Sequence, residues 1–280
     1  MQEQTLQTGR DRNLHARLWS DGGCRPIGLV TAVHGLGDHS ERFDWLAEQL
    51  CAQGYALFAF DLQGHGRSPG GRGRVESYDS LLADIASALE TAAGLVPDVP
   101  HTLLGHSMGG NLALNYVLRA SEFVDPVQLA GLALISPMIL PPNPPQRAHV
   151  LAAWLTGYLF PWFRVRKSVA AGQLTRDAEH AMAMVEDPLT HSRISLYLAT
   201  QLLSQGRWAI DHAREVWLPT LIMHGDDDEL IDRSACENIA VRIGPLASYT
   251  HWPEMRHNLF HDLGRDEVVG RLCDWLGEVA

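Results

Sequence analysis

The sequence predicts an α/β fold in which helices cover both faces of a mostly parallel, eight-stranded sheet. Three observations support this prediction. Short apolar runs alternate with amphipathic helical stretches along most of the chain, as in successive strand–helix–strand units. The runs are apolar throughout rather than at every second position, which is typical of strands buried on both faces. A stretch of about 80 residues lacks a strand pattern, which indicates a helical insertion.

The first half of the chain supplies most of the sheet. Residues 3–9 and 14–19 are expected to form an antiparallel pair that turns at Asp11–Asn13. Further buried strands are expected at 28–33, 55–60, 101–104 and 129–135. Apolar residues at helical spacing predict helices at 42–53, 78–93 and 111–120.

The insertion begins where the composition changes, at Ser136-Pro137, and the proline-rich segment Pro141–Pro145 is a stiff connector. Helices are then expected at about 146–160, 175–186 and 192–205, and the next strand at 218–224. These limits predict a core made of residues 1–136 and 215–280, with a helical cap at 137–214. The core is completed by a helix at 233–243, a strand at 247–250 and a C-terminal amphipathic helix.

Composition excludes several classes of function. The 280 residues are 46% hydrophobic and 20% charged, with a net charge of −11. This acidic balance argues against a nucleic-acid partner, because phosphate binding needs a clustered basic face. The chain has no H-E-x-x-H motif and no Cys/His cluster, so no metal is expected. No G-x-G-x-x-G opens a first strand–helix unit, so no dinucleotide cofactor is expected either.

The sequence also predicts a cytoplasmic location. The N-terminal residues are polar and lack the apolar stretch of a signal peptide. No window approaches the ~18 consecutive apolar residues of a membrane-spanning helix. The four cysteines lie far apart, without the spacing of a disulfide framework, and are expected to be buried free thiols in a reducing compartment: Cys24, Cys51, Cys236 and Cys273.

The segment Gly105-His106-Ser107-Met108-Gly109 has the G-x-S-x-G pattern of a nucleophile elbow. It stands between an expected strand and an expected helix. In such an elbow the serine adopts a strained conformation that exposes its hydroxyl, and a larger residue at either glycine would collide with a neighbouring element. Ser107 is therefore the candidate nucleophile.

A nucleophilic serine needs a base, and the base needs an orienting acid. Asp228 follows the strand at 218–224 and stands at the tip of a turn, whereas Asp226 and Asp227 lie closer to the strand end. Asp228 is therefore the expected acid, and Asp232 is interpreted as a helix N-cap. His257 follows the last strand in a loop. It is preferred as the base over His261, which falls in a helical segment.

Acyl transfer also requires donors for the oxyanion. The backbone N–H of Met108, directly after the nucleophile, is one expected donor. The loop His34-Gly35-Leu36-Gly37 follows a buried strand and offers the backbone N–H of Leu36 as the other. The glycine-rich segment Gly64–Gly66 is expected to shape the neighbouring loop.

Three segments together resemble the monoacylglycerol lipase and lysophospholipase branch of the α/β-hydrolases: His34–Arg42, Asp61–Ser68 and Gly105–Gly110. Glu186–His191 in the cap is also similar to that branch. The resemblance implies an α/β-hydrolase fold and a serine esterase that needs no cofactor. It maps the nucleophile, acid and base onto Ser107, Asp228 and His257, and the oxyanion donors onto Leu36 and Met108.

Two positions depart from the family pattern. Asp38 replaces the glutamate usual in the oxyanion-loop motif. Phe260 stands where mammalian monoacylglycerol lipases carry a second histidine. In those relatives these positions lie near the glycerol end of the site, so the departures bear on glycerol recognition rather than on ester hydrolysis. Asp38 and Arg42 are the expected substrate contacts at this end.

The cap carries a cluster of large apolar residues: Leu151, Trp154, Leu155, Tyr158, Leu159, Phe160, Trp162 and Phe163. One interpretation is a helix packed on the core. The other is a lid that lines an acyl tunnel, with Trp154, Tyr158 and Phe160 contacting substrate. Arg164, Arg166 and Lys167 follow directly and would rest against anionic headgroups in a reversible, peripheral membrane contact.

The chain is thus predicted to be a serine hydrolase that releases a fatty acid from monoacylglycerol or a similar short-to-medium-chain ester. Related alternatives are a lysophospholipase and a general carboxylesterase. The same triad also serves amidases, peptidases and acyltransferases, because a fold does not fix its chemistry. A non-catalytic binding protein of the same fold would have lost a triad member, and none is missing here.

Overall fold

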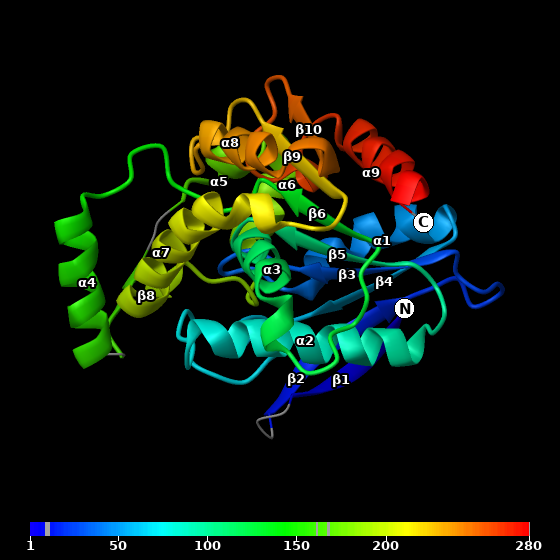
Figure 1. The fold of residues 1–280 in the computed structure, drawn as a ribbon, viewed down its shortest axis with the longest axis horizontal. Helices are drawn as coiled ribbons and strands as arrows, with labels where there is room; N and C mark the ends of the chain where they lie inside the picture. Colours follow the sequence, from blue (N-terminus) through cyan, green and yellow to red (C-terminus); the bar gives the residue numbers. More distant parts are fainter. Residues whose placement is uncertain (9–11, 161, 167–168, 280) are drawn as a thin grey trace.

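The computed structural model describes residues 1–8, 12–160, 162–166 and 169–279. Within these ranges the chain forms an eight-stranded sheet with the strand order β1-β2-β4-β3-β5-β6-β9-β10 (Figure 1). Its strands are β1 (Gln2–Thr8), β2 (Arg12–Trp19), β3 (Gly28–Val33), β4 (Tyr55–Phe60), β5 (His101–His106), β6 (Gly131–Ile135), β9 (Thr220–Gly225) and β10 (Ala247–Trp252). Strand β2 pairs antiparallel with β1 and β4, and the other pairs described in this sheet are parallel. The predicted fold class is confirmed.

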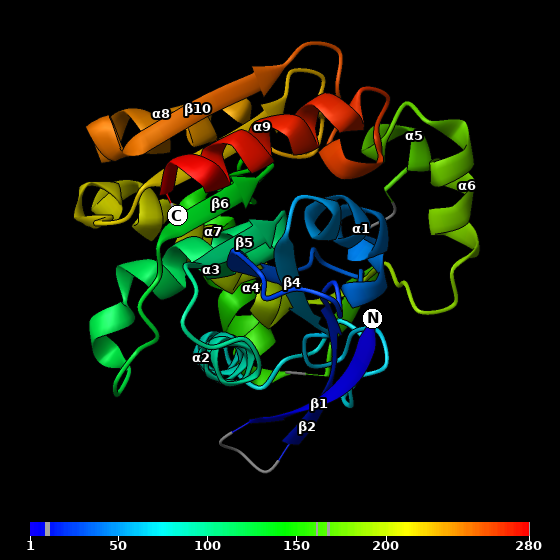
Figure 2. The same cartoon turned by 90° about the vertical axis from the view of Figure 1, so that its right-hand side faces the viewer.

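Helices cover both faces of this sheet (Figures 1 and 2). On one face lie α1 (Asp44–Ala52) and α9 (Arg265–Val279). On the other lie α2 (Tyr78–Leu95), α3 (Met108–Leu118) and α8 (Arg233–Ile243). Leu29 and Val30, adjacent in β3, belong to different hydrophobic cores. Because successive strand residues point to opposite faces, a strand covered on both sides must be apolar throughout.

Residues 136–219 form the insertion between β6 and β9, which are neighbours in the sheet. It contains α4 (Arg147–Leu159), α5 (Ala171–Leu174), α6 (Ala178–Glu186) and α7 (Leu196–His212). Leu198, Leu202 and Ala209 of α7 join the core. Figure 1 shows α4 at the outer edge of the molecule beside α7, with which it makes contact.

The insertion was expected to be helical throughout, and this is wrong in one detail. Two short strands, β7 (Arg164–Arg166) and β8 (Arg193–Ser195), pair antiparallel in a second sheet. Strands of three residues are too short to display an alternating pattern, and their pairing depends on contacts far apart in the sequence.

Several predicted boundaries also shift. The helix expected at 42–53 begins with a 3-10 turn before α1 starts at Asp44. The five described 3-10 segments are η1 (Ser40–Phe43), η2 (Ala120–Glu122), η3 (Ala213–Glu215), η4 (Gly244–Leu246) and η5 (Leu259–His261). Of the turn predicted at Asp11–Asn13, Arg12 and Asn13 belong to β2, and Asp11 lies outside the described residues.

The four cysteines are free thiols, but they are not uniformly buried as expected. Cys236 is buried, Cys51 and Cys273 are partly exposed, and Cys24 is exposed. Among the helices that the structure describes, none has the length and apolar character to span a lipid bilayer.

Candidate active site

Ser107 joins β5 to α3 in the conformation expected of an elbow. Its φ is 55° and its ψ is −117°, a strained region for a residue with a side chain. Hydrogen bonds on both sides hold it there, because Ser107 N donates to Ile135 O at 3.0 Å and Ser107 O accepts from Gly110 N at 3.0 Å. A Cβ at Gly105 would collide with the Gly109 carbonyl. The elbow therefore needs glycine for the steric reason that its pattern predicts.

His257 lies between Ser107 and Asp228. Its Nε2 is 2.8 Å from Ser107 Oγ, and its Nδ1 is 2.7 Å from Asp228 Oδ2. A carboxylate only accepts hydrogen bonds, so the proton of the neutral ring belongs on Nδ1. Nε2 is then free to accept the Ser107 hydroxyl proton. The three side chains come from the carboxyl ends of β5, β9 and β10.

The carboxyl group of Asp228 is fully buried. Its Oδ1 accepts from Leu230 N at 2.8 Å and from Ile231 N at 3.1 Å. Burial alone would raise the pKa of Asp228, but His257 and His224 oppose it with charge and hydrogen bonding and hold this pKa well below its usual range. The carboxylate thus stays ionised in the neutral pH range.

His224 is a further member of this group that the sequence analysis did not single out. It is fully buried at the end of β9, and its Nε2 lies 3.1 Å from Asp228 Oδ2. The sequence feature that could have indicated its role was its position at a strand end, four residues before Asp228. A histidine in an apolar strand is more readily interpreted as a core residue, so the pattern alone did not distinguish the two roles.

One competing acid candidate, Asp226, lies outside this group. Asp226 contacts Arg233 and His251 on the protein surface. The prediction that Asp232 caps a helix is confirmed, because its side chain accepts from Ser234 N at 2.9 Å at the start of α8.

The loop that carries Leu36 lies directly against the elbow. A Cβ built on Gly35 would stand 3.2 Å from Ser107 Cβ. In the described part of the chain, the N–H groups of Leu36 and Met108 have no protein acceptor. Met108 is the first residue of α3. The N–H of a first helical residue has no partner within its helix. Both donors are therefore free to bind an oxygen atom near Ser107.

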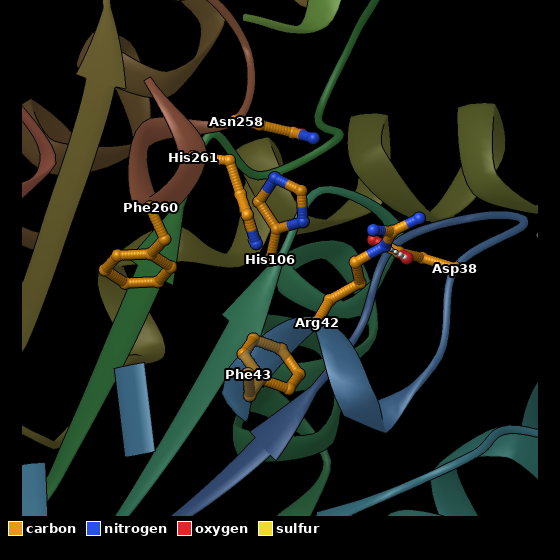
Figure 3. Close-up of a pocket in the computed structure, with 7 residues that line it drawn as sticks. All are labelled: Asp38, Arg42, Phe43, His106, Asn258, Phe260 and His261. Carbon is orange, nitrogen blue, oxygen red and sulfur yellow. Dashed lines mark hydrogen bonds and ion pairs between the residues drawn. The ribbon is translucent and has the colours of Figure 1, made fainter. Parts of the chain in front are cut away.

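A small pocket lies beside this group (Figure 3). Its lining residues are Asp38, Arg42, Phe43, His106, Asn258, Phe260 and His261. The ring of His106 is 5.2 Å from that of His257, centroid to centroid. Burial lowers the pKa of His106 to about 3 and that of His261 to about 4, so both rings are neutral at neutral pH. Asp38 and Arg42 form an ion pair at 2.9 Å within this pocket.

The expected cap contacts do not line this pocket. Trp154 and Tyr158 stack on each other along α4 and are exposed to 38% and 66%. Phe160 is exposed to 47% and meets Trp162 edge to face. The structure therefore brings together Asp38 and Arg42 but leaves these three aromatic residues exposed on the insertion.

Behind the loop at 34–37, three histidine rings lie in series. His65 is 5.1 Å from His34 and 4.7 Å from His191, measured between ring centroids. His34 and His65 are fully buried, and burial lowers their pKa. The loop at Gly64–Gly66 thus packs against the loop that carries Leu36, as expected.

Comparison with known proteins adds an independent observation. Residues 25–264 match the model of the family described as serine aminopeptidase, S33. The chain belongs to this family of α/β-hydrolases. Its members are serine hydrolases, and this chain is an enzyme of that class.

Relatives place the chain in the monoacylglycerol lipase branch of the family. The monoglyceride lipase of Rattus norvegicus is 33% identical over 78% of this chain and 71% of its own length. An uncharacterized abhydrolase domain-containing protein of Dictyostelium discoideum is 31% identical over 98% of this chain, which spans only 28% of that relative. The crystal structure of a Paleococcus ferrophilus monoacylglycerol lipase aligns with a TM-score of 0.84 at 25% identity and covers 95% of this chain and 99% of its own. These findings confirm the family that the motifs indicate.

Proposed function

We propose that this enzyme hydrolyses carboxylic esters of lipids and releases a fatty acid from monoacylglycerol or a similar ester. One observation above all supports the proposal: hydrogen bonds run without a break from Asp228 through His257 to the Ser107 hydroxyl. This is the arrangement that acyl transfer to serine requires.

In the proposed reaction His257 Nε2 accepts the hydroxyl proton while Ser107 Oγ attacks the acyl carbon. The carbonyl oxygen becomes an oxyanion, which the N–H groups of Leu36 and Met108 stabilise. His257 then protonates the leaving alkoxide. Water hydrolyses the acyl-enzyme in a second round, again with His257 as the base, while Asp228 remains ionised and stabilises the imidazolium.

In this proposal the alcohol part of the substrate lies toward the small pocket beside His257. Asp38, Arg42 and Asn258 offer polar groups that suit hydroxyls. Phe260, in contrast, is 4% exposed and packs in the core around α9, so it offers no hydrogen bond to a glycerol hydroxyl. The rat and Paleococcus relatives are named for monoacylglycerol hydrolysis, which supports this substrate class without fixing the acyl length.

Residues 137–214 act in this proposal as a cap through which lipid reaches the site. Large apolar side chains of α4 and the following turn are exposed, with Leu151 at 64% and Trp162 at 62%. Arg164 and Arg166 are exposed next to them, and Lys167 lies outside the described residues. Such a surface suits reversible contact with an anionic bilayer.

Two measurements test the proposed chemistry. A fluorophosphonate probe is expected to label the wild-type protein, and Ser107→Ala is expected to abolish both labelling and ester turnover. A chain-length series of monoacylglycerols, lysophospholipids and p-nitrophenyl esters then defines the substrate. Retained turnover in Ser107→Ala would refute the mechanism.

A peptidase is the second candidate, because the description of the matching family names an aminopeptidase. The same hydrogen-bonded group can attack an amide. Peptide p-nitroanilides assayed beside monoacylglycerols separate the two. Faster turnover of the anilides would overturn the esterase proposal, and a lack of fluorophosphonate labelling would favour a non-catalytic binding protein.

A further inference from the structure

The loop that carries Leu36 contains a turn closed by a long hydrogen bond, from Asp38 N to Gly35 O at 3.3 Å. The loop runs from His34 to Ser40 and contains Gly35 and Gly37. Gly37 has a φ of 77°, a left-handed conformation that glycine adopts without strain. Glycine residues lose more backbone entropy on ordering than other residues do. The position of the Leu36 N–H therefore depends also on contacts from outside the loop.

The core supplies contacts at both ends of this loop. Ser40 N donates to Asp61 Oδ1 at 2.7 Å. His34 Nε2 accepts from Leu62 N at 3.0 Å, so its proton lies on Nδ1, which donates to Gly35 O at 2.8 Å. Gly37, in the middle of the loop, faces the cap instead.

The cap segment Asp187–His191 lies over that middle part. His191 N donates to Gly37 O at 2.9 Å. Asp187 Oδ2 is 2.9 Å from His39 Nε2 and 3.2 Å from Arg42 Nη2. The side chains involved are well shielded, with 2% of His39, 12% of Arg42 and 19% of Asp187 exposed. The Asp187 carboxylate of the cap thus binds His39 near the end of the loop and Arg42 just beyond it.

His39 depends on this contact in particular. Its Nδ1 is buried without a hydrogen-bond partner among the described residues, so Asp187 provides the hydrogen bond that its ring makes. Burial would raise the pKa of Asp187, but hydrogen bonds from Leu189 N and His39 and the charge of Arg42 lower it, so the group is a carboxylate at neutral pH. A buried ring that loses its one partner must shift or admit water.

We propose that Asp187 is a positioning residue for the oxyanion loop: through His39 and Arg42 it holds the Leu36 N–H against Ser107. The inference rests on the proposed function of that loop. Without the carboxylate, the loop gains freedom between Gly35 and His39, and the Leu36 N–H spends less time facing the oxyanion. The weaker hydrogen bond destabilises the transition state more than the bound substrate, because the substrate carbonyl carries less charge than the oxyanion.

The test compares Asp187→Asn with Glu186→Gln, which neutralises the adjacent, exposed carboxylate. The substrate is p-nitrophenyl butyrate, whose short acyl chain makes little use of the cap. Asp187→Asn is expected to lower kcat about 10- to 100-fold, with KM unchanged, because a misplaced donor costs up to about 10²-fold and less than the complete loss of one. Glu186→Gln is expected to keep wild-type kcat and KM.

A second readout follows the oxyanion directly. A trifluoromethyl ketone adds to a reactive serine and forms a tetrahedral oxyanion, so its inhibition constant should rise in Asp187→Asn by the factor by which kcat falls. Titration with a fluorophosphonate counts the competent sites in each variant. If the wild-type protein is not labelled, the proposed function fails, and this outcome differs from failure of the positioning role.

His39→Asn provides an independent variant. It should show the same fall in kcat at constant KM, and combining it with Asp187→Asn should cost little more than the worse single change. His39→Asn alone carries the test if Asp187→Asn does not fold. An unchanged kcat, a rise in KM alone, or fully additive effects would each overturn the proposal.

Discussion

His224 Nε2 lies 3.1 Å from Asp228 Oδ2, the same carboxylate oxygen that lies 2.7 Å from His257 Nδ1. Both His224 and Asp228 are shielded completely from solvent. The acid of the proposed triad is therefore held from two directions, by the base that it orients and by a histidine from the end of its own strand. The other carboxylate oxygen is held by two backbone N–H groups.

Replacing His224 by asparagine should lower kcat/KM about tenfold. The contact at 3.1 Å is assigned the low end of the range for a polar contact with a charged group, about 1.5 kcal/mol, and about 1.4 kcal/mol corresponds to a factor of ten. Steady-state kinetics on a p-nitrophenyl ester measure the loss. The matched control is His101→Asn, because His101 is also buried in the sheet but pairs with Thr31 at 2.8 Å. Equal losses of activity in the two variants would show that His224 acts only on stability.

Asp228→Asn should lower kcat by roughly 10³- to 10⁴-fold. An amide in place of the carboxylate no longer favours the tautomer with the proton on His257 Nδ1, and it carries no charge to stabilise the imidazolium. Asp226→Asn is the control, since Asp226 contacts Arg233 and His251 on the surface and should keep wild-type activity. Single-turnover rates of acylation provide the comparison, and a similar kcat in both variants would exclude Asp228 as the acid.

Acid should destabilise the protein through its buried neutral histidines. Burial lowers the pKa of His101 from 6.5 to about 4 and that of His106 to about 3. The unfolded chain binds protons at these sites near pH 6.5, and the folded chain does not. The stability that these sites contribute is complete above about pH 6.5 and falls by about 1.4 kcal/mol per unit and per site as the pH decreases toward 4.

Urea unfolding at a series of pH values between about 7.5 and 5 measures this dependence. His101→Gln removes one titrating site and should reduce the slope of the free energy of unfolding against pH. A slope that the substitution leaves unchanged would contradict the assignment of His101 as a neutral buried ring.

Membrane contact should depend on the basic residues of β7. Neutralising Arg164 and Arg166 together should weaken partition onto anionic vesicles by roughly 30-fold, since each basic residue near such a surface contributes about 1 kcal/mol. Arg25 and Arg214 are exposed at other positions, so the double change to glutamine there controls for net charge. Co-sedimentation measures the partition, and equal partition of the two double variants would exclude this surface as the contact.

The sequence was sufficient to predict the sheet and the main candidate residues, because both depend on local pattern. A buried strand must be apolar on both faces, and the elbow needs glycine on either side of Ser107. Asp228 and His257 were predictable since strand order and loop position limit the choice. Their hydrogen-bonded geometry agrees with that prediction, and the variants above test their roles.

Contacts between distant segments were not predictable in the same way. The pairing of His39 with Asp187 joins residues 148 positions apart. No pattern in either segment indicates that the two segments are in contact. The strands β7 and β8 are short and lie far apart in the sequence, although they pair in the structure. The exposure of Trp154 and Tyr158 also escaped prediction, because an apolar helical stripe has the same pattern whether it packs on the core or faces a membrane.

The insertion leaves and re-enters the core through one crossover, between the adjacent parallel strands β6 and β9. An insert of another length or sequence could connect the end of β6 to the start of β9. The entropic cost of closing such a connection grows only slowly with its length. Exchange of the outer part of the insertion around α4, in evolution or in an engineered chimera, would thus leave the strand order and Ser107 in place, whereas α7 packs in the core and Asp187 contacts the loop that carries Leu36. Changes of substrate range can arise here by replacement of one contiguous stretch of the gene, while the reactive serine is inherited unaltered.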